Sequence, residues 1–412
     1  MRIEILNTGT ELMLGNTVNT HAAWLGRELF QLGLRIARQT TVPDGEAIRE
    51  AIGESVARAD VLIVTGGLGP TSDDLTKEIA AEVLGLELRT DAAALAALEA
   101  FFAMRGRPMA DANRKQALVP AGADVLANPN GTAPGIHIPP RLNGRDNCAV
   151  FLLPGPPREL YPMFHAEVVP RLRDLTGEAA APSALELKFT GIGESDFHQG
   201  IDARLAQVPG LEYGYCASIG EVDLRLIGTP EALVRGRAIA MERFTPCLVS
   251  DDGASLGEVV VRLLTARHRV LATAESCTGG LIAHRITNVP GASAVFTHGF
   301  VTYSNKAKRG LLGVSADALV AHGAVSETVA CQMAAGALRV SGADIAVAVT
   351  GIAGPAGGTP EKPVGTAWIG LATPNAAATA FRVYHPRNRH DFKLAVSQAA
   401  LDAVRRKLML DR

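Results

Sequence analysis

Ser276 stands at a junction that suits a nucleophile. The run AESCTGG at 274–280 follows the apolar segment 270–274 and precedes a helical pattern that starts near residue 279. A strand that ends just before a helix exposes the hydroxyl between them at a sheet edge, where free backbone N–H groups of the helix could receive a developing oxyanion. The same pattern fits a serine that only caps the helix, and the local sequence by itself slightly favours that simpler role.

A serine nucleophile needs a base, and the segment GFVTYSNKAK at 299–308 offers candidates. It contains Tyr303, Lys306 and Lys308. A partly desolvated lysine beside a serine is neutral often enough to accept its proton, and a tyrosine could relay the proton or orient the lysine. Taken alone this is weak evidence, because such tyrosine–lysine pairs are common and most lysines are solvated.

Other residues of the last segment compete for both roles. His284, His298 and His322 are rival bases, although none has a distinctive context. Cys277 is a rival nucleophile, because a thiol is intrinsically more reactive than a hydroxyl and a helix N-terminus would lower its pKa. The residue pattern leaves this choice open.

Two glycine-rich loops follow apolar strand patterns. TGIAGP spans 350–355, and TGGLGPTSDDLT spans 65–76. Backbone N–H groups in such loops can hold phosphate or carboxamide oxygens. In the second loop Asp73 and Asp74 could hold a divalent cation, or could favour the start of the next helix, which we expect for one of the two.

The elements that position these motifs alternate between strand and helix. In the first segment apolar strands are expected at 2–7, 60–65 and 149–153, with helices at 74–84 and 92–105. This alternation implies parallel pairing, so we expect a doubly wound α/β sheet.

Two small, polar stretches divide the remaining chain. TGEAAAPS at 176–183 and the acidic stretch 250–255 suit linkers. Between them lies a unit of roughly seventy residues, on the order of a minimal α+β domain, with a hairpin turn expected at 218–221. The last segment is α/β again, with a buried strand at 345–350 and an amphipathic helix at 391–410.

Charge and cysteine usage exclude several classes of protein. A net charge of -2 creates no field that attracts nucleic acid, so no direct nucleic-acid binding is expected. The five cysteines form no C-x-x-C pair, which favours a reducing compartment. The first residues lack a signal-peptide profile and the apolar runs are too short for a bilayer, so we expect a cytoplasmic protein without a membrane partner.

Five motifs of the last segment together resemble the CinA C-terminal family, the nicotinamide-nucleotide amidohydrolases also called PncC. They are AESCTGG at 274–280, GFVTYSNKAK at 299–308, HGAVSE at 322–327, TGIAGPAGG at 350–358 and EKPVGT at 361–366. The resemblance implies hydrolysis of nicotinamide mononucleotide to nicotinate mononucleotide and ammonia, in pyridine nucleotide recycling and without a cofactor.

The family resemblance also implies a Ser–Lys mechanism. Ser276 matches the nucleophile, and Lys308, five residues after Tyr303, matches its base. Tyr303 is then a third catalytic residue, Lys306 a surface residue and Cys277 a bystander. The substrate-binding residues implied are Thr278, Gly279, Gly280, Asn305, Gly351, Ala353, Gly354 and Arg389, the last as a phosphate ligand.

The first segment resembles the CinA N-terminal domain through its two strand-to-helix junctions, TGTELMLG at 8–15 and the loop 65–76, together with 128–135 and 154–159. That domain is similar to the molybdopterin-binding fold, and in some relatives it is associated with metal-dependent ADP-ribose pyrophosphatase activity. This chain has His21 where relatives usually carry asparagine. The implied ligand residues are Glu11, Gly66, Gly67, Gly69, Thr71, Asp74 and Gly131, with Asp73 and Asp74 for a divalent cation.

The middle unit resembles the KH-like domain of full-length CinA proteins. Its GIGE run at 191–194 has neither the G-x-x-G spacing nor the positive charge of an RNA-binding KH loop, so we expect a spacer or a dimer element in a homodimer. Three domains are expected, at 1–175, 183–250 and 254–412. The alternative function is a nucleotide- or molybdopterin-binding accessory protein in competence or the DNA damage response, which leaves the five C-terminal motifs unexplained.

Overall fold

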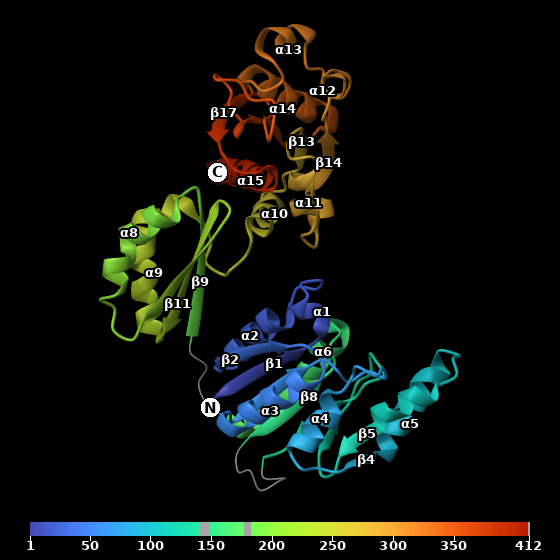
Figure 1. Cartoon of the computed structure of the whole chain (residues 1–412). Coiled ribbons are helices and arrows are strands. Elements are labelled where there is room, and N and C mark those ends of the chain that lie inside the picture. The colour runs from blue at the N-terminus through green and yellow to red at the C-terminus, as the bar shows by residue number, and fades with distance from the viewer. Residues whose placement is uncertain (141–147, 177–182, 411–412) are drawn as a thin grey trace. The chain divides into compact units, whose positions relative to one another are not determined.

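The computed structural model describes residues 1–140, 148–176 and 183–410. The chain divides into two compact units, Met1–Ala181 and Pro182–Arg412, which Figure 1 draws together and which are described separately below. Most of the predicted linker at 176–183 lies outside the described residues. Within the described residues, no helix is both long and apolar enough to cross a membrane.

The first unit is built on a six-stranded sheet of order β2-β1-β3-β8-β7-β6. β2, β1, β3 and β8 run parallel to one another. β7 is antiparallel to β8, and β6 is antiparallel to β7. The strands are β1 (Ile3–Thr8), β2 (Ile36–Val42), β3 (Val61–Thr65), β6 (Asp124–Leu126), β7 (Gly135–Ile138) and β8 (Ala149–Leu153), with β4 (Leu88–Thr90) and β5 (Leu118–Pro120) pairing apart. The predicted α/β sheet is confirmed, and its antiparallel edge was not foreseen because β6 and β7 are too short to show a period.

Helices cover both faces of this sheet, as the doubly wound prediction requires. They are α1 (Thr10–Met13), α2 (His21–Gln31), α3 (Glu46–Arg58), α4 (Thr76–Val83), α5 (Ala92–Met104), α6 (Pro157–Met163) and α7 (Val169–Thr176). Ile48 and Ile52 of α3 pack on one face, and Leu25 and Leu29 of α2 pack on the other. The helix predicted from residue 74 begins two residues later, because the Asp74 carboxylate folds back onto Thr71.

The second unit begins with an antiparallel sheet of order β10-β11-β9-β12. Its elements are β9 (Ser183–Thr190), α8 (Glu194–Leu205), β10 (Glu212–Ser218), β11 (Glu221–Gly228), α9 (Pro230–Phe244) and β12 (Leu248–Ser250). Ser218 pairs with Glu221 across a two-residue turn, so the predicted hairpin is confirmed. Phe189 and Phe197 pack with Phe244 in the core between sheet and helices.

The same unit continues with a five-stranded sheet of order β14-β13-β15-β16-β17. Its strands are β13 (Leu271–Glu275), β14 (Phe296–Val301), β15 (Ile345–Gly351), β16 (Thr366–Ala372) and β17 (Thr379–Tyr384). β14, β13 and β15 are parallel, so their carboxyl ends meet at one sheet edge, whereas β16 and β17 are antiparallel. The loops that carry the predicted site therefore start from neighbouring strand ends.

Two helical layers enclose this sheet (Figure 1). The helices are α10 (Leu256–Ala266), α11 (Leu281–Thr287), α12 (Asn305–Leu312), α13 (Ala316–His322), α14 (Glu327–Ser341) and α15 (Arg389–Leu410). Side chains of α10, α11 and α15 share one apolar core, and side chains of α12, α13 and α14 form a second one.

The last helix, α15, differs from the amphipathic helix predicted at 391–410. Its buried residues include the polar side chains of Gln398, Asp402 and Arg405 as well as its apolar ones. Gln398 Nε2 donates to Thr190 Oγ1 at 3.3 Å, and Arg405 Nη1 donates to the carbonyl of Leu248 at 2.7 Å. The side expected to face water is thus covered by β9 and β12, and its polar groups are satisfied by hydrogen bonds.

Candidate active site

Ser276 and Lys308 meet at the carboxyl edge of the C-terminal sheet. Ser276 follows β13 directly, and its backbone N–H donates to the carbonyl of Val349 in β15 at 3.0 Å. Lys308 lies in α12, where its Nζ is 2.9 Å from Ser276 Oγ. Ser276 is 8% exposed and Lys308 1% exposed, so water barely reaches the pair.

The remaining contacts of Lys308 are two backbone carbonyls. Its Nζ lies 2.8 Å from the oxygen of Thr302 and 3.4 Å from that of Tyr303. Burial lowers the pKa of Lys308, and the nearby Cys277 opposes this only in part. A neutral amine has two N–H groups for the two carbonyls and one lone pair, which is then directed at the serine hydroxyl. The arrangement allows Lys308 to accept the proton of Ser276.

The geometry separates Lys308 from Lys306. Ser304 caps α12 by accepting a hydrogen bond from the N–H of Ala307 at 3.1 Å. This start of the helix turns Lys308 toward the sheet and leaves Lys306 exposed. Only one of the two lysines contacts Ser276.

The rival groups have different surroundings. Burial raises the pKa of the Cys277 thiol to about 12, so at neutral pH the residue is a protonated thiol and a poor nucleophile. His284, His298 and His322 are all exposed, and none of them lines the cavity beside Ser276. The lowered cysteine pKa expected from the helix N-terminus does not occur, because desolvation outweighs it.

Glu275 overturns one expectation about the start of α11. Its buried carboxylate accepts hydrogen bonds from the N–H groups of Gly280, Ile282 and Ala283 at 3.0, 3.1 and 2.9 Å. The first amides of the helix are therefore already paired and are not free to bind an oxyanion. Gly280 precedes the helix with a φ of 94°, a left-handed conformation that favours glycine.

A cavity of about 210 Å³ opens beside Ser276. The predicted site residues that line it are Ser276, Tyr303, Asn305, Lys308, Gly351, Ala353 and Arg389. Thr278, Gly279, Gly280 and Gly354 lie outside its lining. Sequence reasoning missed Ala324, Val325 and Thr350 as lining residues, although the HGAVSE motif contains the first two. The Thr350 hydroxyl donates to the carbonyl of Ala324 at 2.8 Å and thereby links β15 to the HGAVSE motif.

Arg389 links the segment that carries Tyr303 to the glycine-rich loop that carries Gly354. Its Nη2 donates to the Tyr303 hydroxyl at 2.6 Å, and its Nη1 donates to the carbonyl of Gly354 at 3.0 Å. The Tyr303 hydroxyl thus faces the arginine, and Tyr303 contacts Lys308 only through its backbone carbonyl. Tyr303 is placed to orient the lysine rather than to relay its proton.

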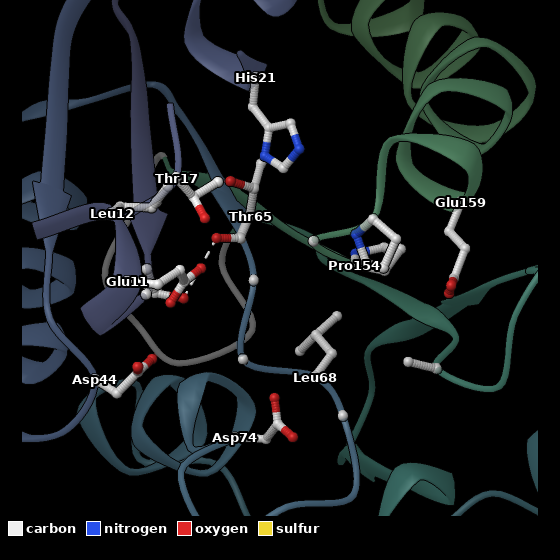
Figure 2. A pocket seen from close by; sticks show the side chains of 18 of the residues that line it. Glu11, Leu12, Thr17, His21, Asp44, Thr65, Leu68, Asp74, Pro154 and Glu159 are labelled. Atoms are coloured by element: carbon white, nitrogen blue, oxygen red, sulfur yellow. Dashed lines mark hydrogen bonds between the residues drawn. The ribbon is translucent and has the colours of Figure 1, made fainter. Parts of the chain in front are cut away.

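A second cavity, of about 490 Å³, lies at the carboxyl edge of the sheet in the first unit (Figure 2). Its lining contains the carboxylates of Glu11, Asp44, Asp73, Asp74 and Glu159 and no lysine or arginine. Gly66, Gly67 and Gly69 also line it, whereas Thr71 and Gly131 do not. Asp44 and Glu159 were missing from the predicted set. His21 lines the cavity as well, and burial lowers its pKa, which favours the neutral ring.

The predicted metal ligands Asp73 and Asp74 do not form a complete cation site. Asp74 Oδ2 accepts hydrogen bonds from the backbone N–H and the hydroxyl of Thr71. Among the residues that the structure describes, no three His, Cys, Asp or Glu side chains lie close enough together to hold a metal. A cation here would therefore need ligand phosphates to complete its coordination, as Mg²⁺ commonly does.

The sheet orders and the buried serine–lysine pair define a multidomain α/β protein with a Ser–Lys site. The CinA C-terminal domain matches residues 253–408, and the "Probable molybdopterin binding domain" matches residues 4–174. A "CinA-like protein" of Akkermansia muciniphila is 51% identical over 97% of this chain and 96% of its own, and another of Geobacter metallireducens is 41% identical over 99% and 100%. The chain belongs to the CinA family.

A crystal structure titled "competence/damage inducible protein CihA from Agrobacterium tumefaciens" is also similar. It is 44% identical in sequence and covers 36% of this chain and 94% of its own, with a TM-score of 0.35. The matches to the two domain families together extend over most of the chain.

Proposed function

We propose that the C-terminal α/β segment hydrolyses the carboxamide of nicotinamide mononucleotide to nicotinate mononucleotide and ammonia. The observation that carries the proposal is the 2.9 Å contact between Lys308 Nζ and Ser276 Oγ in a nearly water-free setting. A neutral, oriented amine beside a hydroxyl is what an amide-cleaving serine needs. The resemblance of the five sequence motifs supports the choice of amide.

The reaction proceeds in two halves. Ser276 Oγ attacks the carboxamide carbon while its proton passes to Lys308, and a tetrahedral intermediate forms. Lys308 then returns this proton to the amide nitrogen, the carbon–nitrogen bond breaks, and ammonia leaves. A water molecule attacks the resulting ester, again giving its proton to Lys308, and the acid is released as Ser276 recovers its hydrogen.

The developing oxyanion needs donors other than the amides held by Glu275. Among the described residues, the backbone N–H groups of Cys277 and Thr278 donate to no backbone oxygen, and they face the Cys277 sulfur instead. Because they directly follow the nucleophile, they are the donors we assign to the oxyanion. Glu275 then fixes the conformation of the turn after Ser276, and Cys277 contributes its backbone N–H rather than its thiol.

Ammonia release tests the proposal directly. The purified chain should produce ammonia and nicotinate mononucleotide from nicotinamide mononucleotide, measured by a coupled ammonia assay and by chromatography of the product. An intact, folded chain that releases no ammonia from this substrate would overturn the proposal.

A second function, in the first unit, is favoured by the charge of its cavity. Five carboxylates and no lysine or arginine repel a bare diphosphate, so such a ligand requires a bridging divalent cation. We infer cation-dependent cleavage of a nucleoside diphosphate sugar such as ADP-ribose. Release of AMP and ribose phosphate with Mg²⁺, and none with a chelator, is the expected result. Binding without cleavage would instead favour an accessory, nucleotide-binding role.

A further inference from the structure

Two of the five C-terminal motifs, HGAVSE at 322–327 and EKPVGT at 361–366, supply no group to the reaction steps at Ser276. Ala324 and Val325 of the first motif nevertheless line the cavity beside Ser276. Their side chains are apolar and carry no proton to exchange, so their contribution is to hold a bound substrate in place. The direction from which the substrate meets Ser276 therefore depends on what fixes this segment.

Side chains fix the segment that joins α13 to α14. Gly323 has a φ of 72°, in the left-handed region that favours glycine, so the chain leaves the helical path directly after α13. Three consecutive carbonyl oxygens then accept hydrogen bonds from side chains. Lys362 Nζ donates to His322 at 2.6 Å, Ser326 Oγ to Gly323 at 3.0 Å and Thr350 Oγ1 to Ala324 at 2.8 Å. Of these donors, Lys362 comes from the second motif.

Lys362 is itself held by the loop that joins β15 to β16. The loop is closed at its base, where the N–H of Gly365 donates to the carbonyl of Ile352 at 2.8 Å. At its far end Thr359 and Lys362 exchange backbone hydrogen bonds of 3.0 and 3.2 Å. The half-buried amine of Lys362 thus extends from a fixed turn to a neutral carbonyl, and a hydrogen bond from a charged donor is stronger than one between neutral groups.

We propose that Lys362 is a positioning residue, which holds the 322–326 segment so that Ala324 and Val325 keep the substrate amide in line with Ser276. Lys362 is not among the residues that line the cavity, so it acts through the carbonyl of His322 rather than on the substrate. The inference rests on the proposed amidohydrolase function and adds to it the role of the two unused motifs. A displacement of about 1 Å can lower a rate about a hundredfold, so a loosened segment is costly.

The kinetic test compares Lys362→Met with Lys306→Met, which removes the same charge from an exposed position of α12 outside the cavity. With nicotinamide mononucleotide, Lys362→Met should lower kcat about tenfold, as expected for the loss of one hydrogen bond from a charged group. KM should change little, because Lys362 does not touch the substrate. Lys362→Arg should restore most of kcat, since a guanidinium can donate to the same carbonyl. Lys306→Met should keep the wild-type kcat.

Hydrogen exchange measured by mass spectrometry reads the segment without any turnover. The amides of residues 322–326 should exchange faster in Lys362→Met than in the wild-type chain, while those of β13 and α12 keep their protection. A wild-type chain that shows this difference but releases no ammonia would remove the proposed reaction and leave the link between the two motifs intact. Unchanged exchange at 322–326, faster exchange throughout the last sheet, or equal kcat in Lys362→Met and Lys306→Met would overturn the positioning role.

Discussion

The amine of Lys308 lies 2.9 Å from the hydroxyl of Ser276, although 32 residues separate them in the chain. Ser276 directly follows β13. Lys308 lies in α12, the helix that follows β14, which is the parallel neighbour of β13. Parallel strands deliver their carboxyl ends to the same edge, so both side chains arrive there from independent segments. The pair is thus a product of strand order, and its chemistry can be tested residue by residue.

Removal of the nucleophile should abolish the reaction. Ser276→Ala should release ammonia at less than about one thousandth of the wild-type rate, because no other group can form the ester intermediate. Cys277→Ser should keep most of the activity, since the buried thiol takes no part. Steady-state ammonia assays of both proteins check this. An inactive Cys277→Ser beside an active Ser276→Ala would show that the nucleophile is misassigned.

The two lysines of α12 should differ sharply. Lys308→Met should lower kcat about a hundred- to ten-thousandfold, the usual contribution of general-base assistance, while still binding substrate. Lys306→Met should stay within a few-fold of wild type, because its exposed side chain has no contact with Ser276. Measured kcat values of the two variants test this. A Lys306→Met protein with a strongly reduced kcat would mean that the geometry of α12 differs in solution.

The pH profile should report the lysine as well. Only the neutral amine accepts a proton, and burial lowers the pKa of Lys308, so kcat/KM should rise with pH through a value below the usual 10.4 of lysine. In the same window the unfolded chain binds the proton more readily than the folded one, so the free energy of unfolding should also rise with pH. Both slopes should disappear in Lys308→Met. Unchanged slopes would point to another titrating group.

The Glu275→Gln variant should show whether Glu275 positions the turn after Ser276 or only stabilises the fold. The new NH₂ group faces backbone donors at the start of α11, so at least one hydrogen bond is lost and unfolding should become easier by about 1.5–3 kcal/mol. The turn after Ser276 then loosens, and kcat should fall with little change in KM. Glu258→Gln is the matched control, because Glu258 accepts from the Ser255 N–H at the start of α10, away from the site. Loss of kcat in both variants would reduce the role of Glu275 to general stability.

In the first unit, Asp74→Asn should remove the cation-dependent part of ligand binding. At a ligand concentration of about 100 times Kd, ADP-ribose with Mg²⁺ should stabilise the wild-type unit by about 2.7 kcal/mol in a thermal-shift series. The asparagine can still accept from Thr71, so the loop should persist while the charge is gone. Asp111→Asn, which is exposed and outside the cavity, should behave as wild type. Equal stabilisation with and without Mg²⁺ would contradict the site.

Local pattern was enough for much of the fold. The strand at 149–153 has the predicted bounds, and the hairpin turn lies at 218–221 as expected. These elements are specified by periodicity and by turn or cap residues that lie within a few positions of one another. The position of Ser276 between a strand and a helix follows from the same short-range signals.

The contacts that decide the chemistry depend on residues far apart in the sequence. Lys308 reaches Ser276 across 32 residues of sequence, and the Tyr303 hydroxyl pairs with Arg389, 86 residues away. The polar side of α15 is buried because Gln398 bonds to Thr190, 208 residues earlier. No local period encodes such pairs, since each depends on which strands are neighbours and on how deeply a group is removed from water. Tertiary structure therefore decides which amine is desolvated and which side chains meet at the site.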